Sequence, residues 1–220
     1  MIRSGELKVS NIRLEPPQEL AMSIGEAMFT QRAIRRMRHD APVKDADLKL
    51  ILDAASKAPN GGNTQPGRFL VIRSREKIKE FGALYHEAWW AKRRDEYGWT
   101  GWKDIPDGSV YRHAALLADE MADAPVIILA LSKPSIPSSI LPAVQNLLLA
   151  ARSLGIGSVL TTLHPEVMER VYTMFQIPED IQFHGCLPLG YPRGNFGTTQ
   201  RLPTAETTYW DSWDAPPPWK

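Results

Sequence analysis

Four arginines crowd into one short segment of the chain, where their side chains could bind an anion. They are Arg32, Arg35, Arg36 and Arg38, placed near the end of a short stretch that favours helix. A guanidinium group binds phosphate bidentately and can also donate to the carbonyl of an anionic ring. The alternative is a solvated basic face near a helix C-terminus, where the helix dipole favours cations. The segment alone leaves both interpretations open.

A second segment, Ala58 to Pro66, combines amide side chains with glycines between a predicted helix and a predicted strand. Its amides are Asn60, Asn63 and Gln65, and its glycines are Gly61 and Gly62. An amide offers both a donor and an acceptor, which suits the mixed polar edge of a heteroaromatic ring, and glycine lets the backbone approach a ligand closely. A generic turn would use the same residue types, so both interpretations stay open.

Aromatic residues are concentrated between Tyr85 and Tyr111, in a segment interrupted by Gly98, Gly101, Pro106 and Gly108. We interpret it as two helices flanking an irregular stretch, which is typical of a lid over a ligand. Flat substrates stack well on such rings. A dimer interface or a core patch would explain the same pattern equally well. The candidate substrate contacts are Trp89, Trp90, Tyr97, Trp99 and Trp102.

Composition narrows the possible partners. The chain has 26 basic and 25 acidic side chains, a formal net charge of +1, so we expect no nucleic acid and no membrane surface as partner. The single cysteine, Cys186, rules out an internal disulfide and fits a cytoplasmic protein. The longest strongly apolar run, Val126 to Leu131, is far shorter than the ~20 residues that cross a bilayer. No signal peptide is apparent in the first residues.

Two other types of site are not indicated. The histidines lack metal-ligand spacing with cysteines or carboxylates, so we expect no metal. Gly155-Ile156-Gly157 lacks the third glycine of a dinucleotide fingerprint.

Hydrophobic periodicity and breakers predict the elements that must position these side chains. Ser23 and Glu26 have the spacing of a capping box, so a helix should begin near Ser23. The order of helices and strands indicates an α+β layered fold, with a central mixed or antiparallel sheet flanked by helices. The other helices are expected at 45–57, from Pro142 to Leu154 and at 165–175, with one on each side of the aromatic stretch between 76 and 123, and the strands at 69–72, 126–131, 157–162 and 184–191.

The chain divides into three parts. Residues 1–22 form an N-terminal extension, and residues 23–205 form one domain whose lid segment spans about 85–111. Residues 206–220 form a tail rich in Pro, Thr and Trp. Because this tail is too apolar to stay in solvent, we expect it to pack on a partner subunit.

Several ordered motifs together resemble the nitroreductase family of flavin mononucleotide (FMN) enzymes, close to the iodotyrosine deiodinase branch. The first is Gln31 to Arg35, which matches an Arg-Arg-Ser/Ala-x-Arg unit, and the second is Ala58 to Gly67. They are followed in the family's order by Ala124-Pro125, Gln145 to Arg152, Leu154 to Gly157, Leu189 to Pro192 and Arg201 to Pro203. The match departs from the family where Gln31 replaces a phosphate-binding Arg and Gly67 replaces Trp.

The resemblance implies an intertwined homodimer with FMN bound between the subunits. It places Arg32 and Arg201 near the phosphate, Arg35 near the ring's N1/O2 side, and Thr161 and Thr162 beside the ring. The loop from Asn60 to Gln65 would reach the flavin of the partner. The complete set implied for the cofactor is Gln31, Arg32, Ala33, Arg35, Asn60, Gly61, Asn63, Gln65, Thr161, Thr162 and Arg201.

The activity implied is transfer of a hydride from NADH or NADPH, through the flavin, to a small organic acceptor such as a nitroaromatic or a quinone, in a ping-pong cycle. The cofactor performs the hard chemistry, so no side chain is assigned as a catalytic acid or base. Two alternatives remain: reductive dehalogenation or oxygen-dependent oxidation on the same fold, and a non-catalytic flavin-binding protein.

Overall fold

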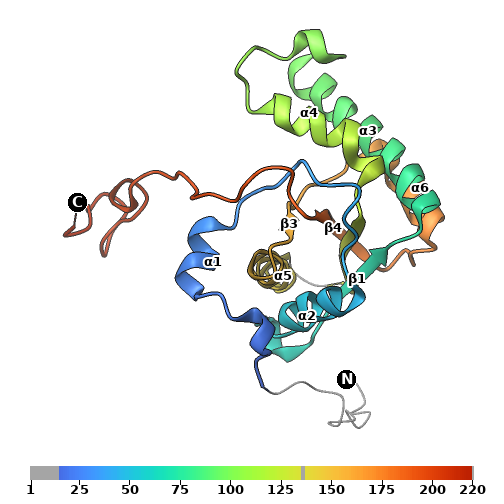
Figure 1. The fold of residues 1–220 in the computed structure, drawn as a ribbon. Coiled ribbons are helices and arrows are strands. Elements are labelled where there is room, and N and C mark those ends of the chain that lie inside the picture. Colours follow the sequence, from blue (N-terminus) through green and yellow to red (C-terminus); the bar gives the residue numbers. More distant parts are fainter. Residues whose placement is uncertain (1–14, 135–136, 220) are drawn as a thin grey trace.

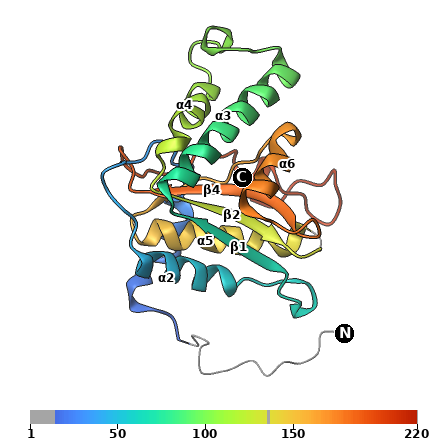
Figure 2. The same ribbon diagram turned by 90° about the vertical axis from the view of Figure 1, so that its right-hand side faces the viewer.

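A four-stranded antiparallel sheet organises the protein in the computed structural model, which describes residues 15–134 and 137–219. The strand order is β1-β2-β4-β3 (Figures 1 and 2). The strands are β1 Gly67–Ile72, β2 Val126–Ser132, β3 Gly157–Ser158 and β4 Gln182–Gly190. All three strand pairings are antiparallel, in agreement with the sheet expected from the sequence.

Helices cover both faces of this sheet, so β2 is buried along its whole length. Figure 2 shows α2 (Asp45–Ser56) and α5 (Leu141–Ser153) on one face. The other face carries α3 (Arg75–Tyr97), α4 (Tyr111–Glu120) and α6 (Pro165–Phe175). Alternate residues of β2 therefore enter separate cores, with Ile127 and Leu129 facing α3 and α6 and Ile128 and Ala130 facing α2 and α5.

Local signals set several helix ends. The Ser23 hydroxyl accepts the Glu26 N–H at 3.1 Å and so caps α1 (Ile24–Thr30), as expected from the sequence. Gly98, at φ 72°, ends α3 in the left-handed conformation that glycine adopts most easily. Short 3-10 turns connect the elements: Gln18–Leu20, Gly61–Asn63, Trp102–Asp104, Met121–Asp123, Pro137–Ser139 and Thr204–Glu206.

The strand expected at 157–162 is shorter than predicted. Only Gly157 and Ser158 pair continuously with β4, and the chain returns to it once, where Thr161 bridges Cys186. Between these two points Leu160 lies over Gly185, where a Cβ would come within 2.6 Å of Leu160 Cδ1. Gly185 therefore leaves room for the Leu160 side chain at the interruption.

Two parts of the chain project from the body. Helices α3 and α4 form an arm with the irregular residues 98–110 at its tip, and the C-terminal residues extend away on another side (Figure 1). The homodimer involves contacts with a second copy of the chain and stays a prediction. Within residues 15–134 and 137–219, no helix is both long and apolar enough to span a membrane.

Candidate functional site

The arginine segment is extended, not helical. Gln31 leaves α1 with extended backbone angles, and the chain then runs beside the sheet edge. Ile34 N–H donates to the Ser158 carbonyl at 3.0 Å, and Arg38 N–H donates to the Tyr191 carbonyl at 2.8 Å. The expectation that the arginines lie at a helix end is therefore corrected. The backbone N–H groups of this segment donate to carbonyls of residues that are far away in the sequence. A helix dipole cannot account for the cluster.

Three of the four arginines, Arg32, Arg35 and Arg36, line a cavity of about 400 Å³ at this edge. Arg32, Ala33 and Arg35 all border it, so three of the predicted cofactor residues are brought together. The remaining walls come from parts of the chain that the sequence did not single out for this role: Ile34, Arg36, His113 of α4, and Pro192, Arg193, Gly194 and Asn195 after β4.

The guanidinium groups of this cavity fall into two kinds. Arg36 and Arg193 both approach the Glu120 carboxylate, at 3.5 and 3.4 Å. Arg32 and Arg35, in contrast, make no hydrogen bond or ion pair with any residue that the structure describes. Partial burial lowers the pKa of Arg35, the Tyr85 hydroxyl opposes this, and the positive charge of Arg32 lowers that pKa further. Two neighbouring cations without a carboxylate partner favour an anionic ligand.

Thr161 is tied to α3 next to this cavity. Its hydroxyl shares a 2.8 Å hydrogen bond with the Tyr85 hydroxyl. Tyr85 is fully buried, and burial raises its pKa, so it stays neutral. Lys92 Nζ donates to the Thr162 hydroxyl at 3.4 Å, which brings the second predicted threonine against the same helix. Both threonines thus lie under the arm.

The second predicted segment, Ala58 to Pro66, lies away from the arginine cavity in the protomer. It borders a separate cavity of about 190 Å³ near the end of α2 and the start of β1, which shares no lining residue with the arginine cavity. Its shape is set internally, since Gln65 N–H donates to Asn60 Oδ1 at 2.8 Å and Gly61 N–H donates to the Ser139 hydroxyl at 3.3 Å. Within one protomer, this loop and the pair Arg32 and Arg35 therefore line different cavities.

Arg201 is exposed and does not line the arginine cavity. Its Nη1 donates to the Gln200 carbonyl at 2.7 Å. The chain just before it passes close to Arg32: Thr199 N–H donates to the Phe29 carbonyl at 3.1 Å, and a Cβ on Gly197 would lie 3.7 Å from Arg32 Nη1.

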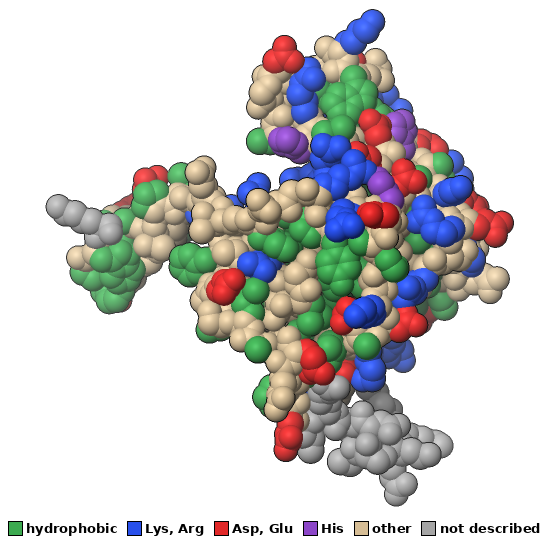
Figure 3. All heavy atoms as spheres, in the orientation of Figure 1, with side chains coloured by type: hydrophobic (Ala, Val, Ile, Leu, Met, Phe, Trp, Pro, Cys, Tyr) green, Lys and Arg blue, Asp and Glu red, His purple; other side chains and the backbone are tan. Residues whose placement is uncertain are grey.

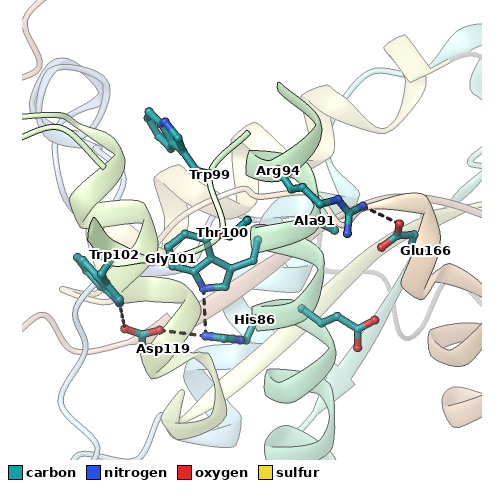
Figure 4. A pocket seen from close by; sticks show the side chains of 11 residues that line it. His86, Ala91, Arg94, Trp99, Thr100, Gly101, Trp102, Asp119 and Glu166 are labelled. Carbon is teal, nitrogen blue, oxygen red and sulfur yellow. Dashed lines mark hydrogen bonds and ion pairs between the residues drawn. The ribbon is translucent and has the colours of Figure 1, made fainter. Parts of the chain in front are cut away.

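The predicted substrate contacts separate into two groups. Trp90, Trp99 and Trp102 line a cavity of about 680 Å³ on the arm, which is shown in Figure 4. Trp89 is only 9% exposed and belongs to the core, so it does not fit a substrate contact in this structure. Tyr97 is outside the cavity and stacks on Trp99 with ring centroids 4.6 Å apart.

Arg93 holds the end of the arm together. It is buried among Trp89, Tyr97 and Tyr111, with its guanidinium carbon 4.7 Å from the Tyr111 ring centroid. Its charge is paired with Glu96 at 2.9 Å. Arg93 is therefore not a solvated helix charge, because the aromatic residues around it bury it and make cation–π contacts with it.

Among the residues that the structure describes, no group of three or more His, Cys, Asp or Glu side chains is placed to hold a metal ion. An antiparallel sheet with helices on both faces and an arginine-lined cavity at its edge defines the protein as an α+β protein. Comparison with known proteins identifies the family.

The nitroreductase family model matches residues 29–191. A putative NADH dehydrogenase/NAD(P)H nitroreductase of Methanothermobacter thermautotrophicus is 32% identical over 188 residues, covering 80% of this chain and 81% of that protein. The iodotyrosine deiodinase of Thermotoga neapolitana is 29% identical over 169 residues, covering 74% and 84%. The chain therefore belongs to the nitroreductase family. The resemblance stated from the sequence and the assignment as an oxidoreductase enzyme are confirmed.

Solved structures support the fold. An oxidised iodotyrosine deiodinase bound to FMN and 3-iodo-L-tyrosine aligns with a TM-score of 0.68 and 25% identity, covering 82% of this chain and 96% of that one. A nitroreductase of Bacteroides fragilis with bound FMN gives 0.65 and 21%, covering 86% and 100%. The predicted nitroreductase-like α+β fold is confirmed.

Proposed function

We propose that this protein is an FMN-dependent oxidoreductase. It takes electrons from NADH or NADPH and passes them to a small organic acceptor, such as a nitroaromatic or a quinone, in a ping-pong cycle. Support comes from the family, from relatives named NAD(P)H nitroreductases, and from structural neighbours with bound FMN.

The observation that carries the proposal is the guanidinium pair of Arg32 and Arg35, which have no hydrogen-bond or ion-pair partner within residues 15–134 and 137–219. The chemistry of this cavity fits FMN, whose phosphate is an anion and whose ring presents carbonyl acceptors. Arg32 would bind the phosphate, and the partly buried Arg35 would donate to the N1/O2 side of the ring. Bound FMN supplies the two-electron chemistry, while the protein orients it and balances its charge.

The remaining predicted residues complete the proposed site. Thr161 and Thr162 are hydrogen-bonded to Tyr85 and Lys92 of α3, and they would lie beside the ring. Arg201 would contribute a second charge to the phosphate, Gln31 and Ala33 would border it, and Asn60, Gly61, Asn63 and Gln65 would come from the partner. The separation of the arginine and loop cavities within one protomer supports this division between two subunits.

The visible spectrum of the purified protein tests the proposal. We expect a yellow protein, or one that becomes yellow on addition of FMN, and bleaching of the flavin absorbance during anaerobic titration with NADH or NADPH. A protein that stays colourless with FMN contradicts the proposal. Tight FMN binding without turnover of any acceptor would instead identify a flavin-binding protein.

Reductive dehalogenation is the second candidate, favoured by the similarity to iodotyrosine deiodinases. Its test is incubation of the reduced holoprotein with 3-iodo-L-tyrosine under anaerobic conditions, with chromatography for tyrosine and iodide. Formation of both, together with slow reduction of the flavin by nicotinamides, would favour this candidate over the reductase. Rapid reduction by a nicotinamide and no iodide would exclude it.

A further inference from the structure

The cavity on the arm is walled by three indole rings and by charged groups from three helices. Trp90 belongs to α3, and Trp99 and Trp102 belong to the stretch between α3 and α4. Figure 4 shows Trp102 and Asp119 on one side and Glu166 on the other, with His86 and Arg94 of α3 between them. Two of the three carboxylates there are neutralised by arginines. Arg170 Nη1 donates to Glu87 at 2.9 Å, and Arg94 Nη2 donates to Glu166 at 2.7 Å.

Asp119 differs from those two carboxylates because no arginine or lysine contacts it within the described residues. Its Oδ2 accepts the Trp102 indole N–H at 3.0 Å, and its Oδ1 lies 3.2 Å from His86 Nε2. Charge on Asp119 is thus balanced only when His86 is protonated.

His86 cannot satisfy both of its neighbours at once. Its Nε2 lies 3.2 Å from Trp90 Nε1, and an indole nitrogen can only donate. When Nε2 accepts this hydrogen bond it carries no proton, so it has nothing to donate to Asp119 Oδ1. That oxygen is then a charged acceptor without a donor among the described residues, on the wall of a cavity lined by aromatic rings.

We propose that this cavity binds a planar aromatic molecule that carries a protonated amine and no carboxylate. The ring stacks on the indoles, and the ammonium donates to Asp119 Oδ1, where the indole faces also attract a cation. An anionic group is disfavoured because its charge would face Asp119. Identification of this molecule as the electron acceptor rests on the proposed function.

Three probes that share a phenol ring test the charge preference: tyramine, 4-ethylphenol and 3-(4-hydroxyphenyl)propanoate. Binding to the FMN-loaded protein is measured by calorimetry near neutral pH. We expect tyramine to bind at least about tenfold more tightly than 4-ethylphenol, and the carboxylate to bind most weakly. Equal affinities, tightest binding of the carboxylate, or no binding of any probe overturns the proposal.

Two variants assign the preference to Asp119. Asp119→Asn keeps an acceptor for Trp102 but removes the charge, so tyramine should bind within about twofold of 4-ethylphenol. Asp107→Asn is the matched control: it lies on the same arm, it is fully exposed beside Arg112, and it should keep the wild-type preference. Loss of the preference in both variants, or in neither, overturns the assignment. The flavin spectrum of each preparation is recorded separately, so failure to bind FMN is distinguished from failure to bind the amine.

Discussion

Unpaired charge is the main functional signal at the scale of single residues. Arg36 and Arg38 have carboxylate partners, Glu120 and Asp40, whereas Arg32 and Arg35 have none among the described residues. A cation that is partly withdrawn from water without a counter-ion costs free energy, which a bound anion recovers. Both types of arginine occur within seven residues, so sequence proximity does not distinguish them.

Arg35→Ala should weaken FMN binding and slow reduction of the FMN that remains bound. Loss of hydrogen bonds to a charged group costs about 1.5–3 kcal/mol, which corresponds to at least a tenfold rise in the dissociation constant. Arg35→Lys should fall between wild type and Ala, because lysine keeps the charge but not the planar fork. The dissociation constant is measured by flavin fluorescence quenching. Arg38→Ala, outside the cavity, is the control, and an equal loss there would contradict the assigned role.

His184 should make stability depend on pH. Burial lowers its pKa below 6.5, and its Nε2 shares a 2.7 Å hydrogen bond with the Ser132 hydroxyl. Between the lowered value and 6.5 the unfolded chain binds the proton and the folded chain does not, so stability is lost as pH falls through this window. The free energy of unfolding, measured with urea at several pH values, should fall more steeply with falling pH in wild type than in His184→Gln. The difference between the two pH slopes should be at most about 1.4 kcal/mol per pH unit. Identical slopes would contradict this assignment.

At the scale of elements, the position of the arm depends on close contact between α3 and the turn after α4. Gly82 faces Ala122, and a Cβ there would lie 2.4 Å from the Ala122 Cα. Backbone cannot yield as a flexible side chain can. The glycine therefore allows the two elements to approach, although glycine is a poor helix former.

Gly82→Ala should destabilise the protein by about 2 kcal/mol, because forced overlap outweighs the gain in helix propensity. The free energy of unfolding is measured by urea denaturation. Gly25→Ala in α1 is the control, since nothing lies within 4 Å of the added methyl, and it should change stability by less than about 1 kcal/mol. A stable Gly82→Ala variant would mean that α3 and the turn can separate without cost.

At the scale of the whole molecule, the C-terminal tail exposes more aromatic surface than a solvated segment normally does. Tyr209, Trp210, Trp213 and Trp219 are 43–76% exposed. They pair with one another, Tyr209 stacking on Trp213 at 4.4 Å and Trp210 meeting Trp219 at 5.2 Å. Figure 3 shows hydrophobic side chains gathered on the projection that carries the C-terminal segment in Figure 1. Exposed apolar patches of this kind often mark interaction surfaces, and packing of the tail on a partner subunit stays a prediction.

Removal of residues 204–220 should weaken the proposed homodimer by at least tenfold, since burial of several aromatic rings is worth a few kcal/mol. Sedimentation velocity over a concentration series measures the change. The variant Trp213→Ser, with the tail present, should have a smaller effect of the same sign. A full-length protein that is monomeric at all concentrations contradicts both the dimer and the division of the flavin site.

The sequence by itself determined whatever depends on neighbours along the chain. Ser23 begins a helix, Gly155 follows the end of another, and Pro165 starts a third, because caps, left-handed glycines and helix-compatible prolines act within a few residues. The order of the motifs was also sufficient to identify the family.

Only the tertiary structure decided which faces and segments meet. Trp89 and Trp90 are adjacent in sequence, yet about 100° of helical rotation directs one into the core and the other into the cavity. His113 and Arg193 join Arg32 because α4 and the chain after β4 fold onto the same edge. The pairing of His86 with Asp119 likewise joins two helices. These contacts depend on packing between residues far apart in the chain, which no local pattern specifies.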